Sequence, residues 1–312
     1  MLNSKEEIAI VCFAYKRPYH LKKCLASILK NKESKGIPLI VYVDGPKNDL
    51  DQRERAKVID LVKETKGFKK IKLKERKTNF GLYLSLTKGI SETLEHYKKV
   101  IIIEDDISVS PFFLNYMIEA LSLYEGDKDV ASIHGYLPPI KEKLPNSFFL
   151  RGADCWGWGT WDDRWQWFRS DAANMKYEIK KLNLSKKFNL ENGFDYLGML
   201  DDKIAGNNNS WAICWHASCF LKNKLTLHPG KSMVKNIGLD NSGENCKPSE
   251  SFESNTFNEK LNIKKINICE DKNIRKYFSN HFKSNNLFLK SKLMRLLRLF
   301  HIDRFINYLV RN

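Results

Sequence analysis

The chain has 312 residues, 42% of them hydrophobic, enough for one large domain or one domain with an appendage. A formal net charge of +16 suits a nucleic acid, an anionic small molecule or an anionic membrane as partner, or a lysine-rich solvated surface. Seven cysteines without a C-x-x-C pair argue against a zinc site and indicate reduced thiols in a cytosolic protein. The first residues lack the apolar run of a signal peptide, and no apolar stretch approaches the ~18 residues of a membrane span.

The first 136 residues alternate between apolar runs and segments with helical spacing. Strands are predicted at 8–15, 38–45, 69–75, 99–106 and 130–136, and helices at 18–31, 50–66, 83–97 and 111–124. Pro111 is expected at the first position of the last helix. The alternation predicts a mostly parallel α/β sheet with helices on both faces.

The composition changes after about residue 145, because segment 148–168 holds five of the seven tryptophans. A weakly periodic helical region follows at 173–206, then a helix at 210–224, a strand and loop at 225–238, and a polar loop at 247–260. We therefore predict one domain over 1–246 with halves 1–136 and 137–246, a linker over 247–285, and a terminal helix.

The terminal helix is predicted over 286–312 and is basic and amphipathic. One face carries the apolar side chains and the other the arginines, with lysines at the flanks: Leu289, Leu293, Leu296, Leu297 and Phe300 against Arg295 and Arg298, flanked by Lys290 and Lys292. Such a helix can lie in a lipid headgroup layer. It can equally dock on its own domain with Lys and Arg exposed, and the hydrophobic pattern alone does not separate the two.

Polar residues follow four of the predicted strands. These segments are Phe13–Pro18, Asp44–Pro46, Asn79–Leu82 and Glu104–Asp106. Because ligands of open α/β sheets bind at the carboxyl ends of the strands, we expect the four segments to converge on one edge.

Glu104, Asp105 and Asp106 directly follow a buried apolar run. Three adjacent carboxylates need a counter-charge, and Mg²⁺ or Mn²⁺ supplies it while taking only one or two protein carboxylates, the rest being phosphate and water. The pattern predicts a metal that bridges the protein to a diphosphate, with Lys16 and Arg17 nearby. The alternative is capping of the following helix. Neither a P-loop nor a dinucleotide-binding motif is present.

The ordered set AYKRP, VDG, NFGL and IIIEDD resembles nucleotide-sugar glycosyltransferases of the GT-A fold. Downstream, CWGWGTW and SWAICWHAS with LTLHPGKSMVKNIGLDNSG resemble bacterial family-two-like enzymes of surface polysaccharide synthesis and, more distantly, N-acetylglucosaminyltransferase I. The resemblance covers roughly residues 7–246. It implies a GT-A (Rossmann-like) α/β fold with a mixed, mostly parallel sheet flanked by helices, to which the C-terminal helix is an extension.

The resemblance also implies site roles. Asp106 would bind Mn²⁺ or Mg²⁺ under the diphosphate of a nucleoside-diphosphate sugar, with a UDP-sugar as the first candidate. The other donor-binding positions are Ala14, Tyr15, Arg17, Asp44, Asn79, Glu104, Asp105, Trp156 and Trp158. Among these, Asp44 would contact uracil or ribose, Glu104 and Asp105 the sugar and ribose, and the two tryptophans would offer flat faces to sugars.

An inverting transferase also needs a base that takes the proton of the acceptor hydroxyl. Candidates are Asp162 and Asp163 after the WGWG motif, where related galactosyltransferases place acids, and Asp201 and Asp202 further on. N-acetylglucosaminyltransferase I has its base before a later Trp, where this chain has no acid. Asp162 and Asp163 can instead be a charge pair at a helix N-terminus.

Three histidines, His134, His216 and His228, are either metal ligands or hydrogen-bonded structural residues. We expect a transferase that extends a glycan or lipid-linked acceptor of a bacterial surface polysaccharide at the inner face of the cytoplasmic membrane. One alternative is a sugar-phosphate nucleotidyltransferase, although CFAYKRP lacks the glycine-rich loop. The other is a basic nucleic-acid-binding protein, which the strand-end acids oppose, so we expect no nucleic acid partner.

Overall fold

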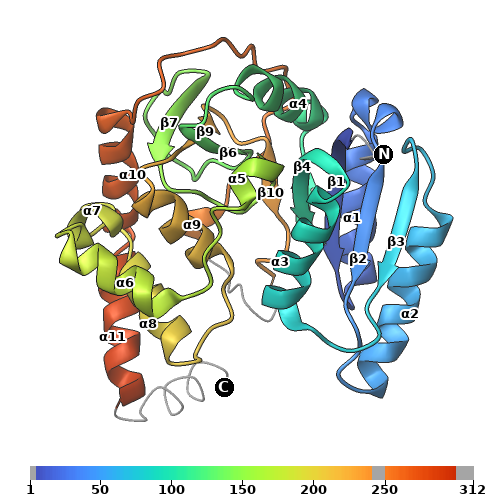
Figure 1. The fold of residues 1–312 in the computed structure, drawn as a ribbon, viewed down its shortest axis with the longest axis horizontal. Coiled ribbons are helices and arrows are strands. Elements are labelled where there is room, and N and C mark those ends of the chain that lie inside the picture. Colours follow the sequence, from blue (N-terminus) through green and yellow to red (C-terminus); the bar gives the residue numbers. More distant parts are fainter. Residues whose placement is uncertain (1–4, 241–249, 300–312) are drawn as a thin grey trace. The chain divides into compact units, whose positions relative to one another are not determined.

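The computed structural model describes residues 5–240 and 250–299, and the chain divides into two compact units (Figure 1). Unit 1 comprises Met1–Ser170 and Ser210–Asp271, and unit 2 comprises Asp171–Asn209 and Lys272–Asn312. Within the described residues, no helix is both long enough and apolar enough to span a membrane.

Unit 1 contains an eight-stranded sheet in the order β3-β2-β1-β4-β8-β6-β9-β7. The strands are β1 (Glu6–Ala14), β2 (Leu39–Val43), β3 (Ile71–Glu75), β4 (Tyr97–Glu104), β6 (Val130–His134), β7 (Ser147–Arg151), β8 (Trp158–Trp161) and β9 (Leu225–Pro229). β8 runs antiparallel to both β4 and β6, and β7 runs antiparallel to β9, while the other pairs are parallel. The prediction of a mixed, mostly parallel sheet is therefore confirmed.

A second, two-stranded sheet pairs β5 (Ile107–Val109) with β10 (Val234–Asn236) in antiparallel fashion. The sequence analysis did not predict β5, which follows the acidic triplet at once. The helix after it, α4 (Phe113–Leu123), begins two residues beyond Pro111. Pro111 lies in the preceding turn, because the Phe113 N–H donates to the Ser110 carbonyl at 3.1 Å.

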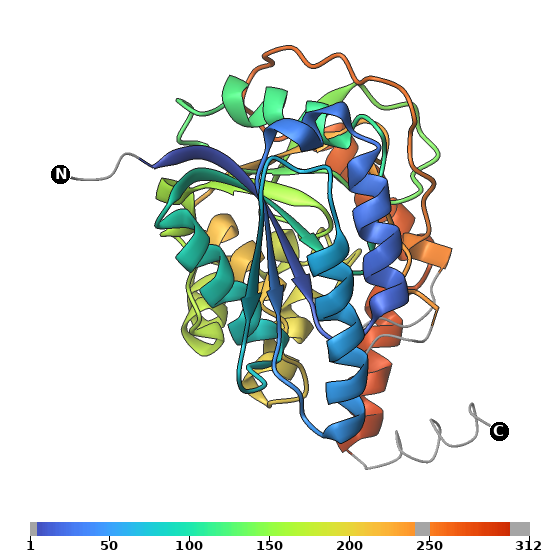
Figure 2. The same cartoon turned by 90° about the vertical axis from the view of Figure 1, so that its right-hand side faces the viewer.

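Helices cover both faces of the large sheet, as its doubly buried strands require. One face packs against α1 (Pro18–Leu29), α2 (Asp49–Glu64) and α4, and the other against α3 (Gly81–Leu94) and α9 (Ala212–Leu221). Figure 2 shows α1 and α2, in blue, on one side of the first strands and α3, in teal, on the other. Along β1, alternate residues enter the two cores, Ile10 and Cys12 one and Ala9 and Val11 the other.

Three short elements complete the regular structure of unit 1 among the described residues. A 3-10 turn, η1 (Lys32–Gly36), follows α1, and the single-turn helix α5 (Asp162–Trp165) follows β8. A further 3-10 turn, η2, spans Glu250–Phe252.

Unit 2 is helical. It contains α6 (Ala172–Lys181), α7 (Ser185–Phe188), α8 (Tyr196–Ile204), α10 (Lys272–Ser284) and α11 (Leu287–Leu299). Aromatic side chains form its interior, with Phe194 packed on Tyr196 at 4.7 Å and on Phe282 at 5.2 Å between ring centroids. Arg275 of α10 ties the helices together by pairing with Glu191 at 2.9 Å.

The units differ from the predicted domains. Residues 171–209 group with the C-terminal helices, while the described residues 250–271 stay with unit 1, where Glu270 bridges to Phe149. Residues 272–284, predicted to be linker, form α10. A unit assembled from two separated segments leaves no compositional boundary along the sequence, so the linear division missed it.

Helix α11 pairs its two arginines with aspartates of unit 2 and exposes three of its leucines to solvent. Arg295 pairs with Asp195 of the loop before α8, and Arg298 pairs with Asp202 at 3.0 Å. Leu289, Leu293 and Leu296 are 64%, 56% and 51% exposed. Leu289, Leu293 and Leu296 are therefore not docked on the domain, which contradicts docking through the whole apolar face, whereas the Arg298 side chain keeps an exposed fraction of 40%. Residues 300–312 of the predicted helix lie outside the described residues.

Candidate active site

Six strands of unit 1 (β1, β2, β3, β4, β6 and β9) run in the same direction and end at one edge of the large sheet, here called the carboxyl edge. Register aligns Ala14 with Val43 across β1 and β2, and Phe13 with Glu104 across β1 and β4. The Asp44 N–H donates to the Ala14 carbonyl at 3.1 Å, and the Asp105 N–H donates to the Phe13 carbonyl at 3.0 Å. The segments after β1, β2 and β4 thus meet, as the sequence analysis expected.

The acidic triplet carries more negative charge than its neighbours neutralise. Arg17 pairs with Asp105, and with Asp106 at 2.9 Å. Burial, followed by the charges of Asp106 and Asp105, raises the pKa of Glu104 to about 8. Burial also raises the pKa of Asp105 to about 6, although Arg17 acts in the opposite direction. A further cation at this position would lower the pKa of both acids again.

The triplet does not cap α4. The first N–H groups of that helix are met by Asn31, whose Oδ1 accepts from the Leu114 N–H at 2.8 Å, and by Ser110, whose hydroxyl accepts from the Phe112 N–H at 3.2 Å. Asp106 lies instead against the chain after β10, where the Ile237 N–H donates to its carbonyl at 2.8 Å. A Cβ atom on Gly238 would stand 2.4 Å from Asp106 Oδ2, so this glycine leaves room for the carboxylate.

The triplet suits a divalent cation in its donor chemistry. Carboxylate oxygens are the ligands that Mg²⁺ and Mn²⁺ prefer. Among residues 5–240 and 250–299, no three His, Cys, Asp or Glu side chains form a ready metal cage. A cation here would therefore be held by one or two carboxylates and by oxygens of a bound diphosphate.

Asp44 fixes the shape of the edge through backbone contacts. Its Oδ1 accepts from the N–H groups of Gly45 at 2.9 Å and Phe80 at 2.8 Å, and its Oδ2 accepts from Gly81 at 2.9 Å. Asn79 donates from Nδ2 to the Gly45 carbonyl at 2.6 Å. Both predicted donor-binding residues thus join the loop after β2 to the start of α3.

Tyr15 connects the end of β1 to α2. Its hydroxyl donates to Asp51 Oδ2 at 2.7 Å and accepts from the Lys47 N–H at 3.1 Å. Lys16 pairs with the other oxygen of Asp51 at 2.7 Å. The sequence analysis missed Asp51 and also Arg55, whose Nε donates to the Asp44 carbonyl at 2.7 Å, because both lie on a polar helix with no motif.

The two predicted sugar-facing tryptophans have different surroundings. Trp158 is 0% exposed, and its ring stacks on Trp211 at 5.4 Å between centroids. The structure thus places it in the core, which contradicts a role as a sugar wall. Trp156 is partly exposed at the carboxyl edge and meets Tyr136 edge-on at 4.7 Å.

Asp162 and Asp163 lie at the opposite edge of the sheet, here called the amino edge, because β8 is antiparallel. Trp161 aligns with Lys99 near the start of β4, five residues before Glu104. At roughly 3.3 Å per residue, the two acidic groups are about 17 Å apart along the strands. The prediction that either is the base beside the triplet is wrong.

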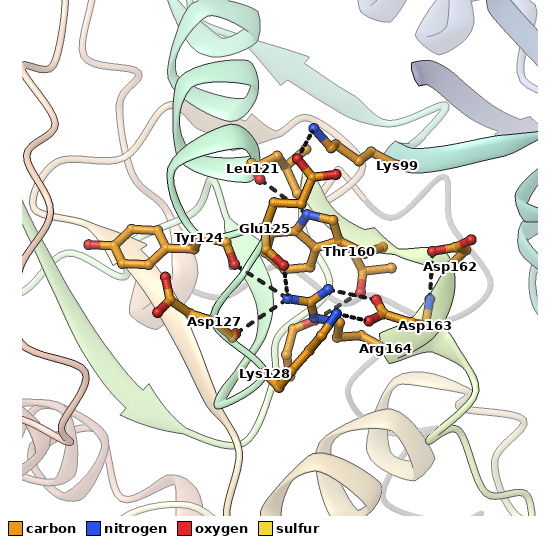
Figure 3. Close-up of polar contacts among 12 residues, drawn as sticks. Lys99, Leu121, Tyr124, Glu125, Asp127, Lys128, Thr160, Asp162, Asp163 and Arg164 are labelled. Carbon is orange, nitrogen blue, oxygen red and sulfur yellow. Dashed lines mark hydrogen bonds and ion pairs between the residues drawn. The ribbon is translucent and has the colours of Figure 1, made fainter. Parts of the chain in front are cut away.

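At the amino edge these acids are fully engaged in a structural network (Figure 3). Asp162 pairs with Lys5 at 2.7 Å, and Asp163 pairs with Lys128 and with Arg164 at 2.6 Å. Burial raises the pKa of Asp163, but hydrogen bonds from Lys128 and Arg164 outweigh it and hold the pKa below its usual value. Arg164, 1% exposed, also donates to the carbonyl oxygens of Glu125 and of Asp127.

Asp201 and Asp202 belong to unit 2. Asp201 pairs with Lys176 of α6, and Asp202 pairs with Arg298 of α11. Both pairs join helices within unit 2, which gives these aspartates a structural role there.

The three histidines gather beside the loop that precedes β8. His134 Nδ1 lies 3.3 Å from His228 Nδ1, and His216 Nδ1 lies 2.7 Å from the Ala153 carbonyl oxygen. Asp154 stands in the same loop. The sequence analysis quoted its segment, GADCWGWG, for the tryptophans alone and missed the acid two residues before Trp156.

Three comparisons with known proteins bear on this geometry. No curated protein sequence matches the chain. Solved structures that resemble it include a mannosyltransferase from Pyrobaculum calidifontis in complex with GDP-Man and Mn²⁺, at 13% identity, 42% of this chain, 36% of that chain and a TM-score of 0.32. Another is S. aureus TarS 1–349, at 11% identity, 57% of this chain, 49% of that chain and a TM-score of 0.33.

A third structure, described as mannose-1-phosphate geranyltransferase from Thermus thermophilus, has 10% identity, covers 74% of this chain and 76% of that one, and has a TM-score of 0.37. The chain spans less than half of the length of the first two proteins. With TM-scores below 0.5, the three likenesses carry no argument about substrate. Residues 1–140 match the model of the GNT-I family, and this match confirms the resemblance of this part of the chain to GT-A nucleotide-sugar glycosyltransferases.

Proposed function

We propose that this protein is a metal-dependent, inverting glycosyltransferase that moves a sugar from a nucleoside-diphosphate sugar, with UDP-sugars as first candidates, to a glycan or lipid-linked acceptor of a bacterial surface polysaccharide. The observation that carries the proposal is the under-neutralised triplet Glu104–Asp106 at the carboxyl edge, beside Arg17. The family match over residues 1–140 covers this whole half of the sheet.

The residues at the edge divide the work of donor binding. Asp106 would hold Mn²⁺ or Mg²⁺, which when bound neutralises the departing diphosphate. Arg17, which pairs with Asp106 at 2.9 Å, would offer a second positive charge to the same phosphates. Asp44 and Asn79 join the loops after β2 and β3, which would receive the nucleoside.

A donor screen tests this function. Purified full-length protein is incubated with UDP-, GDP- and dTDP-sugars, with Mn²⁺ or with EDTA, and release of nucleoside diphosphate is measured. We expect release from one class of donor, lost in EDTA. Consumption of a nucleoside triphosphate and a sugar phosphate, with no release from any nucleotide sugar, would identify a nucleotidyltransferase instead.

We also propose that α11 rests on an anionic membrane surface, which would hold the enzyme at the inner face of the cytoplasmic membrane near a lipid-linked acceptor. Its exposed leucines form one row, with Lys290 and Lys292 exposed beside them and no acidic residue in the helix. Arg295 and Arg298 are engaged with Asp195 and Asp202, so the leucine row is the face that remains for lipid.

Vesicle flotation tests the membrane contact. Full-length protein should float with phosphatidylglycerol-containing vesicles, and the variant with Leu289, Leu293 and Leu296 replaced by Ser should stay behind. The matched control is Leu50→Ser, an exposed leucine at 68% on α2. Flotation of the triple variant equal to that of the wild type would refute the contact.

A further inference from the structure

The loop between β7 and β8 brings a carboxylate to the carboxyl edge. β8 starts at this edge, since Trp158 aligns with both Ile102 of β4 and His134 of β6. The Gly135 N–H donates to the Gly157 carbonyl at 2.7 Å, which ties the end of the loop to the end of β6. Asp154 therefore stands at the carboxyl edge with the triplet, whereas Asp162 and Asp163 stand at the amino edge.

Glycines hold this loop at both ends. Gly152 has φ of +102° and Gly157 has φ of +61°, a region in which other residues are strained. A Cβ atom would stand 2.4 Å from the His216 ring at Gly152 and 2.7 Å from Val234 at Gly157. The backbone that presents Asp154 is thus set by close packing on both sides, as a preorganised group requires.

Asp154 is accessible and has no cationic partner among the described residues. Its Oδ1 accepts from the Cys155 N–H at 2.8 Å, its Oδ2 lies 3.7 Å from His134 Nδ1, and its side chain is 42% exposed. Burial of part of the group raises its pKa, against smaller opposing effects of His228, the Cys155 N–H and His216. Asp154 differs from Asp105 and Asp163 in having no cationic partner among the described residues, since each of those two is paired with an arginine.

His134 orients the surroundings of this carboxylate without neutralising it. The Trp156 N–H donates to His134 Nε2 at 3.2 Å, so the ring proton sits on Nδ1, toward Asp154 and His228. Burial lowers the pKa of both histidines to about 3, so both are uncharged at neutral pH. An uncharged neighbour leaves Asp154 free to accept a proton.

We propose that Asp154 is the general base of the transfer reaction, and that the loop Gly152–Gly157 supplies both the base and, through Trp156, a wall for the sugar. The acceptor oxygen forms a bond to the anomeric carbon, while the bond from that carbon to the diphosphate oxygen breaks with its electron pair. The hydroxyl proton passes to an Asp154 oxygen. His134 is a positioning residue. This assignment rests on the proposed glycosyltransferase activity.

The experiment compares Asp154→Asn with Asp163→Asn in the full-length protein. With the donor identified by the screen, release of nucleoside diphosphate to water is measured together with the affinity for UDP, or for the nucleoside diphosphate of that donor. We expect Asp154→Asn to lose at least about a hundredfold in kcat, since general-base catalysis typically contributes that much or more, with nucleotide affinity within about twofold of the wild type. Asp163→Asn should keep both values.

Two outcomes would overturn the assignment. Retained turnover in a folded Asp154→Asn variant removes Asp154 from the mechanism, and so does a loss of nucleotide affinity equal to the loss of turnover. Should Asp154→Asn fail to fold, Asp154→Ser gives the same comparison. Absence of release and of binding in the wild type, with every donor, refutes the proposed function instead, so the two failures are distinguishable.

Discussion

The two edges of the large sheet each carry a cluster of acids, and their counter-charges differ. At the amino edge, Lys128 and Arg164 pair with Asp163 and hold its pKa below the usual value. At the carboxyl edge, Arg17 pairs with Asp105 and Asp106, yet the pKa of Glu104 still rises to about 8. Acids that the fold neutralises serve stability, whereas acids left short of positive charge are prepared for a ligand that brings it.

The largest effect is expected at the carboxyl edge. Asp106→Asn should lower metal-dependent nucleotide release by about a thousandfold, because the cation contributes several kcal/mol to stabilising the departing diphosphate. Release is measured with Mn²⁺ and with EDTA. Release by Asp106→Asn at the wild-type level with Mn²⁺, or release by the wild type that persists in EDTA, would remove the distinction between the two edges.

The amino edge should respond in stability and leave turnover alone. Arg164→Met should lower the free energy of unfolding by about 3 kcal/mol, because Asp163 and the carbonyl groups of Glu125 and Asp127 lose their buried donor. Urea unfolding measures the change. Lys128→Met, at a side chain 62% exposed, is the control and should cost less than about 1 kcal/mol. A loss of turnover in folded Arg164→Met would count against a purely structural network.

The histidine pair predicts how stability depends on pH. The pKa of His134 and of His228 is about 3 in the folded chain, against about 6.5 when unfolded. At pH values between about 3 and about 6.5, the two histidines are protonated in the unfolded chain and unprotonated in the folded chain. The stabilisation is therefore complete above about pH 6.5 and is lost as pH falls, by up to about 1.4 kcal/mol per pH unit for each histidine.

Urea unfolding at about pH 7.5 and about pH 5, on either side of the unfolded pKa, tests this slope in the wild type and in a variant with His134 and His228 both replaced by Gln. The other titrating groups, including Asp154 and His216 nearby, are common to both proteins, so the difference isolates the pair. An equal slope in the two proteins would show that the histidines are protonated in the folded state.

The smallest effect is expected from Glu104→Gln, which tests whether Glu104 and Asp106 have different roles. Glu104→Gln should weaken donor binding by roughly tenfold, the value of one charge-assisted hydrogen bond, and leave the metal requirement intact. Donor affinity by calorimetry and the Mn²⁺ dependence of release are measured together. Equal loss of the metal requirement in Glu104→Gln and Asp106→Asn would mean that the two acids share one role.

The sequence predicted most of the carboxyl edge because parallel strands carry their end residues to one place. Tyr15, Arg17, Asp44 and the triplet all follow apolar runs of the parallel half, where order along the chain fixes the edge. Order along the chain no longer tells at which edge a strand ends once antiparallel strands enter the sheet. Asp162 and Asp163 were expected beside the triplet because related galactosyltransferases place acids after the WGWG motif, and nothing in TWDDRW shows that β8 runs against β4.

Buried aromatic residues were the second source of error. Trp156 and Trp158 are two apart, and in a strand such neighbours share a side of the sheet. Trp156, however, precedes β8, so its orientation is set by Gly157 and not by the strand. Trp158 enters the core beside Trp211, a partner over fifty residues away that no local pattern reveals. Unit 2 escaped prediction for the same reason, because its two segments are distant along the chain.

The antiparallel course of β8 has a practical consequence for redesign. Residues 153–157 and residues 162–164 are almost adjacent in the sequence, yet a full strand of four residues, about 13 Å, separates the loop from the helix that follows it. If the loop lines the acceptor site as proposed, a library confined to Ala153, Cys155 and Trp156 would alter acceptor preference, while the proposed base Asp154 stays in place and the Arg164 network keeps its stability. Conversely, stabilising substitutions around Lys128 and Asp163 can be introduced first. The added stability would then compensate for the destabilisation that substitutions for new specificities usually cause.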